Sequence, residues 1–369
     1  MSENCFIETD DEVQAPGGLC VLIDGHWLID GPPSGKNVLE GIIRGWTEAF
    51  PQDELTIRLP AGPLPHFVEN LSIQRSGPLS GKNHALSVLT TKAHEDHFDA
   101  YLSQNFGGIL GSTPKFTFLH DGIYKAQPRW FSMLERLYLC LIKPSLFRSR
   151  AIFTSSDSEK KRIETLWPSL DGKVEAIGLA VPYALVEATA SEPNALQMFS
   201  RPYLMTVGRL NIRKNLARLI EAYSNSPISD EFDLYVVGEP NGLAGKIDRQ
   251  HPGVNFLTAV KDDQLRWLYE HATAFIFPSL DEGFGLPIIE AAYFGIPIAA
   301  SDIAPFREVG VASQYFNPEN IESIKQAMEC LVDKSPEGAV PYDASKLQSW
   351  TAVVSHLRDR ILTELKESS

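Results

Sequence analysis

Two glutamates and two glycines between residues 282 and 290 are the side chains of this sequence best suited to chemistry. The stretch begins Glu282-Gly283-Phe284-Gly285-Leu286-Pro287 and reaches Glu290. The two glycines allow backbone conformations closed to other residues, so a ligand can approach the main chain closely. The free N–H groups at the start of the helix that Pro287 opens favour an anion such as phosphate. Carboxylates beside such a site suit hydroxyl donors, so the stretch predicts a ligand that carries both phosphate and hydroxyls.

The surroundings of this stretch predict one strand–loop–helix–strand unit. An apolar strand, Phe275–Phe277, precedes it and a second, Pro297–Ser301, follows it. Such a unit joins parallel strands, and ligands in open α/β sheets bind outside the carboxyl ends of the strands. An ordinary turn with surface glutamates is the alternative interpretation, because short glycine motifs often occur by chance.

A second loop places cations at the end of another predicted strand. The strand beginning at Tyr203 ends in Gly208-Arg209, and Lys214 follows five residues later. Two permanent cations at the carboxyl end of a strand can neutralise the charge that develops on a departing diphosphate, in place of a metal. A solvated basic loop is the alternative.

Two weaker candidates lie in the first half of the chain. His120 directly follows the predicted strand Phe116–Leu119, where it can touch a substrate; a structural histidine is the alternative. Ser34 and Gly35 lie between the strand Leu19–Ile23 and a helical stretch from about 36 to 50. The prolines beside them make a rigid connecting turn the alternative there.

Composition excludes several classes of protein. The chain has 369 residues, 43% hydrophobic and 22% charged, which is ordinary for two soluble globular domains. Its net charge of −14 argues against a nucleic-acid partner. Four scattered cysteines lack the spacing of a zinc cluster and indicate reduced thiols. We expect no signal peptide, because the first eighteen residues contain no Lys or Arg and no apolar core, and no run of transmembrane length.

These patterns predict an α/β protein with two domains. Residues 1–17 are acidic and aperiodic, which predicts a loose tail. The first domain is predicted over 18–185 and the second over 186–349, with an irregular linker at Val181–Pro202. Further strands are predicted at Leu55–Leu59, Ala85–Leu89, Ala151–Ser156, Val174–Leu179, Phe232–Gly238 and Val254–Thr258.

One apolar helix is predicted over Pro128–Phe147, with cations close behind its apolar residues. We favour a helix packed against the sheet, because its apolar residues occupy more than one face and cations suit a helix C-terminus. A weak peripheral membrane contact through residues 128–150 is the second interpretation, and it would serve a lipid-linked acceptor.

The stretch from 275 to 308 resembles the donor-site signature of the retaining glycosyltransferases of family 4. These enzymes have the GT-B arrangement of two Rossmann-like domains facing a cleft. The resemblance rests on Pro278-Ser279, on Glu282 to Pro287, on Glu290, and on Gly208-Arg209 with Lys214-Asn215. It is strong from Tyr203 to Tyr315 and loose before that. It also makes Trp350 the start of a C-terminal helix, about 350–369, that crosses back to the first domain.

The resemblance also implies roles for site residues. Glu282 would contact the donor hexose, Glu290 the nucleotide ribose, and Arg209 and Lys214 the diphosphate. The remaining donor-binding positions it implies are Gly283, Phe284, Gly285, Leu286, Val260, Ser34 and Gly35. Val260 belongs to the loop for the base, whose identity stays open because Thr258 stands where the family usually has Gly.

We therefore interpret the chain as a retaining, cytoplasmic hexosyltransferase. It would move mannose, glucose, rhamnose or a related sugar from a UDP, GDP or dTDP donor to a hydroxyl of a glycan or glycolipid in polysaccharide assembly. Glu282, His120, Arg209 and Lys214 are the predicted catalytic residues, with front-face displacement, no metal and no cofactor. A GT-B sugar-nucleotide epimerase and a non-catalytic partner subunit are the alternatives.

Overall fold

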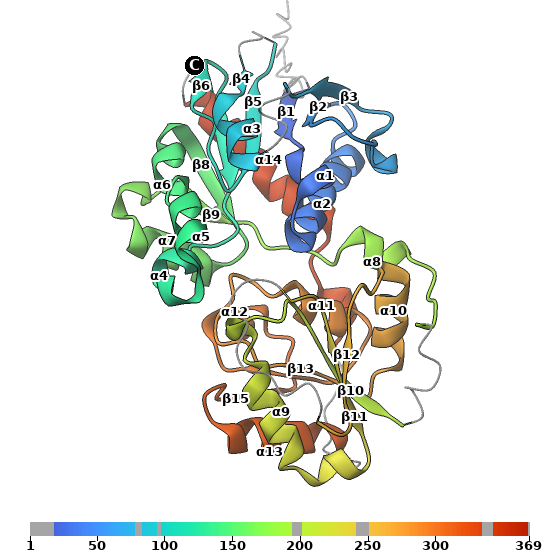
Figure 1. Ribbon diagram of the computed structural model, residues 1–369. Helices are drawn as coiled ribbons and strands as arrows, with labels where there is room; N and C mark the ends of the chain where they lie inside the picture. The colour runs from blue at the N-terminus through green and yellow to red at the C-terminus, as the bar shows by residue number, and fades with distance from the viewer. Residues whose placement is uncertain are drawn as a thin grey trace, which may run out of the picture.

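The structure is a computed structural model that describes residues 18–77, 83–93, 97–193, 201–240, 251–333 and 342–367. The tail predicted at 1–17 lies outside the described residues. Figure 1 shows two α/β domains, one above the other, each built around its own sheet. The predicted GT-B arrangement of two Rossmann-like domains is confirmed.

The first domain contains a parallel seven-stranded sheet of order β3-β2-β1-β5-β7-β8-β9, and a small pair, β4 with β6. Its strands are β1 (Cys20–Asp24), β2 (Glu54–Leu59), β3 (Ser72–Arg75), β4 (Lys92–Ala93), β5 (Ala100–Gln104), β6 (Leu110–Gly111), β7 (Lys115–Phe118), β8 (Ser149–Thr154) and β9 (Val174–Ala176). Its helices are α1 (His26–Asp30), α2 (Pro33–Ala49), α3 (His84–Thr90), α4 (Ile123–Ala126), α5 (Met133–Leu139), α6 (Ile142–Ser145), α7 (Asp157–Leu166) and α8 (Tyr183–Glu187).

The second domain contains a parallel six-stranded sheet of order β12-β11-β10-β13-β14-β15. Its strands are β10 (Tyr203–Val207), β11 (Asp233–Val237), β12 (Val254–Leu257), β13 (Ala274–Phe277), β14 (Ile298–Ser301) and β15 (Gln314–Phe316). Its helices are α9 (Leu216–Ser224), α10 (Asp262–His271), α11 (Leu286–Tyr293), α12 (Ala304–Val309) and α13 (Ile321–Val332), and α14 (Trp350–Lys366) follows.

Alternation along the buried strands places helices on both faces of each sheet. On β13, Phe275 and Phe277 join the core cluster that contains α11, whereas Ile276 between them joins the cluster that contains α9 and α13. Successive strand residues point to opposite faces, so continuously apolar strands are covered on both sides. The carboxyl ends of these strands therefore carry the loops of the site.

Helix α14 packs against α2 of the first domain, as predicted (Figure 1). A Cβ atom on Gly41 of α2 would lie 2.2 Å from the Trp350 ring, so the absence of a side chain makes room for the indole. The indole N–H of Trp350 donates to the carbonyl of Val181 at 2.9 Å. Further along α14, Arg358 forms an ion pair with buried Asp53 at 2.6 Å. The chain thus crosses between the domains twice.

Two predicted elements are wrong. Ala85–Leu89 lies in helix α3 and not in a strand, because the Asn83 side chain accepts from the N–H of Leu86 and caps a helix there. The sheet instead contains β5 between β1 and β7, and the sequence patterns did not predict this strand.

The single helix predicted over Pro128–Phe147 is broken into a 3₁₀ turn at Pro128–Trp130, α5, α6 and a second 3₁₀ turn at Leu146–Arg148. The predicted packing against the sheet holds for Ile142 and Leu146, which are buried in a core cluster with Ile152 of β8, and it is wrong for several other apolar side chains of this segment, which are exposed. Leu134 and Met133 expose 79% and 78% of their surface, and Leu137, Leu141 and Phe147 are exposed as well.

Candidate active site

The glycine loop lies between β13 and α11, at the carboxyl edge of the second sheet. Gly285 is the residue before α11 and has a φ of +98°, and a Cβ there would lie 2.6 Å from the Phe306 ring. Pro287 occupies the first turn of α11, where a missing N–H costs no hydrogen bond. Gly285 and Pro287 thus produce a tight loop that leads into α11, a buried helix whose first N–H groups have no partner within the helix.

Glu282 on this loop is bound by two cations from the loop between β10 and α9. Its carboxylate accepts from Lys214 Nζ at 2.6 Å and from Arg213 Nη1 at 2.6 Å. Lys214 extends across Gly208, where a Cβ would lie 2.7 Å from its Cε, and its ammonium lies 4.5 Å from the centre of the Phe277 ring. The two loops recognised in the sequence therefore meet at one place, 68 residues apart along the chain.

Charge pairing keeps Glu282 ionised although it is only 6% exposed. Burial raises the pKa of this carboxyl, but Arg213 and Lys214 outweigh burial and hold the pKa at about 2. Burial lowers the pKa of Lys214, and Glu282 opposes that change. The site thus contains one carboxylate and two cations, and a charged ligand can replace the carboxylate as the partner of the cations.

Glu290 lies inside α11, where its carboxylate accepts from the hydroxyl of Tyr269 at 2.8 Å. Burial raises the pKa of Glu290 to about 7, which the Tyr269 hydrogen bond only partly offsets. A buried carboxylate with one protein donor has spare acceptor sites for a ligand hydroxyl.

His120 lies across from the glycine loop, after β7 of the first sheet. A Cβ on Gly283 would lie 2.9 Å from the carbonyl oxygen of His120, so the two segments touch. The His120 Nε2–H donates to Gln104 Oε1 at 2.5 Å, and the ring packs 5.1 Å from that of Trp27. Burial lowers the pKa of His120 to about 3. The ring is therefore neutral at physiological pH and can orient or accept from a hydroxyl.

Four further predicted donor-binding residues lie on or next to loops of the second domain. Arg209 is near enough to Arg213 and Glu282 to interact with their charges, and it forms no ion pair with a described residue. Val260 lies just before α10, next to Ala259, whose N–H donates to Glu239. Phe284 and Leu286 flank Gly285 on the loop.

Ser34 and Gly35 do not form the loop that the sequence predicted. They lie in the first turn of α2, because Pro33 starts that helix early. Gly35 is covered by Trp27, whose ring would be 2.3 Å from a Cβ, and Ser34 is exposed. Lys36 in the same turn acts electrostatically on Asp262 of α10, so this end of α2 faces the second domain.

The sequence patterns missed the residues that join the two domains. Ser156 Oγ donates to the carbonyl of Gly283 at 2.7 Å, and Arg162 of α7 forms an ion pair with Asp281. The Glu308 carboxylate accepts from the N–H of Ser158 at 2.9 Å and of Asp157, at the N-terminus of α7. The acidic and hydroxyl residues beside the loops could have indicated these contacts. No rule of sequence spacing, however, predicts which residue of one domain bonds to which residue of the other.

The described residues contain neither a cluster of metal ligands nor a membrane-spanning helix. No group of three or more His, Cys, Asp or Glu side chains there could hold a metal ion. No helix in this part of the chain is long and apolar enough to cross a membrane.

Known proteins are similar to this chain in sequence. Residues 194–345 match the family model described as glycosyl transferases group 1. The chain is 28% identical over 205 residues to O-antigen chain mannosyltransferase B of Escherichia coli, covering 52% of this chain and 54% of that protein. It is 29% identical over 242 residues to the serotype-specific mannosyltransferase WbdA of Escherichia coli, covering 60% of this chain and 30% of that protein. The chain thus spans about half or less of the length of these relatives.

Solved structures share the whole fold. Sucrose-phosphate synthase from Thermosynechococcus elongatus matches with a TM-score of 0.65 and 16% identity, over 95% of this chain and 100% of that one. HepE from Anabaena, in complex with UDP and glucose, matches with a TM-score of 0.63 and 15% identity, over 93% and 99%. The predicted resemblance to GT-B glycosyltransferases is confirmed.

Proposed function

We propose that this chain, whose residues 194–345 match the family model of the glycosyl transferases group 1, transfers a hexosyl unit from a nucleotide-diphosphate sugar to a glycan hydroxyl in polysaccharide assembly. One observation carries the proposal most directly: Lys214 and Glu282 meet at the glycine loop that opens α11. A cation, a carboxylate and free helix N–H groups therefore lie together at the carboxyl edge of one parallel sheet. The cation and the N–H groups suit a phosphate, and the carboxylate suits sugar hydroxyls.

We propose that donor binding regroups the charges of this centre. The diphosphate takes Lys214 and Arg209, and Glu282 turns its carboxylate to hexose hydroxyls. Glu290 accepts from a ribose hydroxyl. The bond between the anomeric carbon and the phosphate oxygen then breaks, and the electron pair leaves with the diphosphate, whose charge the cations stabilise.

The acceptor oxygen attacks the same face of the sugar in this mechanism. Its proton passes to the departing phosphate oxygen, so the linkage keeps the anomeric configuration of the donor. Neutral His120 orients the sugar from the first domain and closure excludes water. Cationic side chains perform the neutralisation that a metal performs elsewhere, and we propose a metal-independent reaction.

A thermal-shift panel of UDP-, GDP- and dTDP-linked sugars tests this proposal, because a ligand that binds the folded state alone raises the melting temperature. Mannose comes first among the hexoses, since the similar O-antigen enzymes are mannosyltransferases. We expect one nucleotide class to stabilise the protein equally with and without EDTA, and Lys214→Ala to lose the effect. Lys346→Ala, an exposed lysine, is the matched control.

The outcomes separate the alternatives. Nucleotide release that depends on an added glycan acceptor supports transfer, whereas conversion of the donor without acceptor supports an epimerase. Absence of stabilisation by every member of the panel would contradict the donor site.

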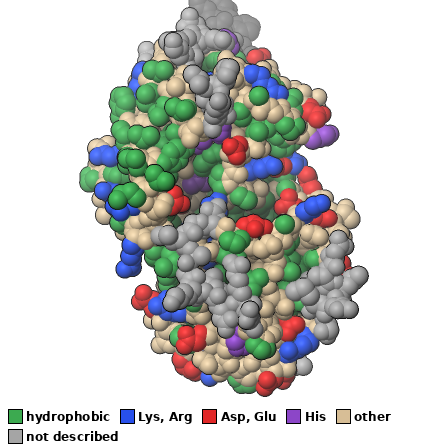
Figure 2. Space-filling view, viewed as in Figure 1, with side chains coloured by type: hydrophobic (Ala, Val, Ile, Leu, Met, Phe, Trp, Pro, Cys, Tyr) green, Lys and Arg blue, Asp and Glu red, His purple; other side chains and the backbone are tan. Residues whose placement is uncertain are grey.

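We further propose a cytoplasmic enzyme that touches the membrane surface weakly through residues 128–150. The apolar patch of this segment consists of Met133, Leu134, Leu137, Leu141 and Phe147, all exposed. Exposed cations lie among them, at Arg136, Lys143 and Arg148. Figure 2 shows hydrophobic and basic side chains together at the left of the upper domain, where Figure 1 places α5 and α6. Apolar anchors with surrounding cations suit an anionic lipid surface.

Vesicle sedimentation tests this contact with phosphatidylcholine alone and with added phosphatidylglycerol. We expect binding only to the anionic vesicles and its loss in the double variant Leu134→Ser/Leu137→Ser. Leu86→Ser is the matched control, since Leu86 is exposed on α3 outside the patch. Equal binding by the double variant and the control would contradict this contact.

A further inference from the structure

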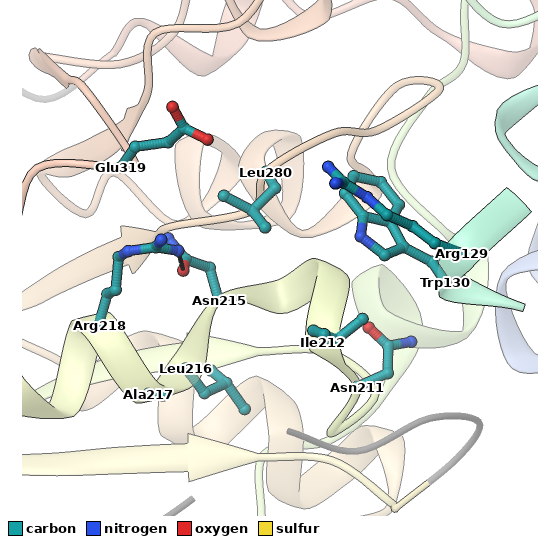
Figure 3. A pocket seen from close by; sticks show the side chains of 10 residues that line it. All are labelled: Arg129, Trp130, Asn211, Ile212, Asn215, Leu216, Ala217, Arg218, Leu280 and Glu319. Atoms are coloured by element: carbon teal, nitrogen blue, oxygen red, sulfur yellow. Dashed lines mark hydrogen bonds between the residues drawn. The ribbon is translucent and has the colours of Figure 1, made fainter. Parts of the chain in front are cut away.

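A cavity lies between the two domains and is lined by residues next to the loops that carry the donor site (Figure 3). It has a volume of about 560 Å³, within the range of about 300–1,000 Å³ typical of small-molecule sites. Arg129 and Trp130 of the first domain form one wall. The opposite wall and floor come from the second domain, from the segment 211–218 together with Leu280 and Glu319.

The cavity is separated from Glu282 by two loops that are bonded to each other. The N–H of Leu280 donates to the carbonyl of Arg213 at 2.8 Å, and Arg213 Nη1 donates to the carbonyl of Asp281 at 3.3 Å. Ile212 and Leu280 face the cavity, whereas the residues next to them, Arg213 and Asp281, belong to the charge network of the donor loop. A molecule in the cavity would therefore lie beside the reacting centre without occupying it.

The wall of the cavity is held rigidly. Buried Asn215 donates through Nδ2 to the carbonyls of Pro278, at 3.1 Å, and Pro318, at 2.7 Å. Its side-chain oxygen accepts from Arg218 Nη1 at 2.8 Å, which holds that guanidinium at the cavity. One side chain thus connects α9, the end of β13 and the loop before α13.

Two arginines, Arg129 and Arg218, outnumber the single carboxylate of the lining, Glu319, so the charges of the cavity favour an anionic sugar. Neither Arg129 nor Arg218 forms an ion pair with a described residue, in a chain of net charge −14. Guanidinium groups suit carboxylates and phosphates, and the Trp130 ring offers an apolar face to a sugar ring. The buried Oδ1 atom of Asn211 has no partner among the described residues and can accept from a hydroxyl.

We propose that this cavity is an acceptor subsite that binds an internal sugar of the acceptor glycan bearing a carboxylate or phosphate group. The sugar lies against Trp130, its anionic group meets Arg129, and Arg218 adds positive charge from the opposite wall. The inference rests on the proposed glycosyl transfer and specifies its acceptor. Because both domains contribute walls, acceptor binding also favours the arrangement in which His120 touches the donor loop.

Ligand-observed saturation-transfer NMR tests the subsite with three probes: methyl β-glucuronide, mannose 1-phosphate and methyl α-mannoside. A saturating nucleoside diphosphate blocks the donor site during the titrations. We expect one or both anionic sugars to bind at least about tenfold more tightly than the neutral one, the effect of one charge-assisted hydrogen bond. The glucuronide and the phosphate distinguish a carboxylate in the glycan from a sugar phosphate.

Variants locate the binding. Arg129→Ala and Trp130→Ala should each weaken binding of the anionic sugar about tenfold or more. Arg136→Ala removes the same charge from the same segment but does not line the cavity, and should bind as the unchanged protein does. Unchanged binding in Arg129→Ala and Trp130→Ala, or equal binding of neutral and anionic sugars, would overturn the subsite. Failure of the donor site would appear separately, as absence of stabilisation by nucleotides.

Discussion

Replacing Glu282 by glutamine should destabilise the free protein and at the same time increase the stabilisation that a nucleotide provides. Glu282 is 6% exposed and Lys214 is 8% exposed, and their atoms are 2.6 Å apart. The pKa of Glu282 is about 2, against an ordinary value of 4.5, which corresponds to about 3 kcal/mol in favour of the ionised form in the folded protein. Removing one partner of a buried ion pair costs about 3–5 kcal/mol. Glu282→Gln leaves Lys214 and Arg213 without that partner.

The assay is thermal unfolding with and without a nucleoside diphosphate. One kcal/mol shifts the melting temperature of a domain of this size by about 2–4 °C, so Glu282→Gln should lower it by about 6–12 °C. A bound diphosphate restores negative charge beside the cations. The nucleotide-induced rise should therefore be larger for Glu282→Gln than for the unchanged protein, and absent for Lys214→Ala.

An exposed pair provides the matched control. Glu322 lies 3.5 Å from Lys325 with 59% of its side chain exposed, and surface ion pairs contribute only about 0–1 kcal/mol. Glu322→Gln should hardly change the melting temperature or the rise in melting temperature that the nucleotide causes. Equal melting temperatures of Glu282→Gln and Glu322→Gln, or a smaller stabilisation of Glu282→Gln than of the unchanged protein by the nucleotide, would refute this role of the buried ion pair. As the pH falls from 4.5 towards 2, the stability from the Glu282 carboxylate should be lost.

Three further predictions concern other parts of the molecule. Burial raises the pKa of Glu290 to about 7, so its contribution to the free energy of unfolding is present below pH 4.5 and is lost as the pH rises to 7. Glu290→Gln should remove this loss of stability from melting curves recorded over that pH range. An unchanged dependence of the melting temperature on pH would contradict the prediction. Gly41→Ala should destabilise the protein by about 1–3 kcal/mol in urea, because its Cβ would overlap Trp350; equal or greater stability would refute this contact. His120, with a pKa of about 3, should produce no inflexion in turnover between pH 5 and 8; an inflexion lost in His120→Asn would show otherwise.

The sequence was most informative where short-range chemistry decides the structure. Apolar runs such as Phe275–Phe277 predicted parallel strands, and Gly285 with Pro287 predicted the loop and helix that follow. The cations after β10 and the glutamates after β13 were identified because each lies at the end of a strand. Those features depend only on neighbouring residues.

The sequence patterns could not predict contacts between residues that are distant in the chain. The binding of Glu282 by Lys214 joins loops 68 residues apart, and the hydrogen bond of Tyr269 to Glu290 depends on how α10 packs. The run Ala85–Leu89 was too short to distinguish a strand from a helix, and the Asn83 cap was the signal that was overlooked. The exposure of Leu134 could not be predicted, since an apolar pattern does not show whether a partner covers it.

The return of α14 to the first domain has a consequence for the order in which the chain can fold during synthesis. The second domain is an insertion between Val181 and Trp350, whose side chain closes the gap by bonding back to the Val181 carbonyl. The first domain's core includes residues of α14, such as Val353, Val354 and Leu357. A ribosome therefore releases a complete second domain before the first one has all of its core. The face of α2 therefore stays uncovered until α14, which follows the whole second domain in the chain, has been made.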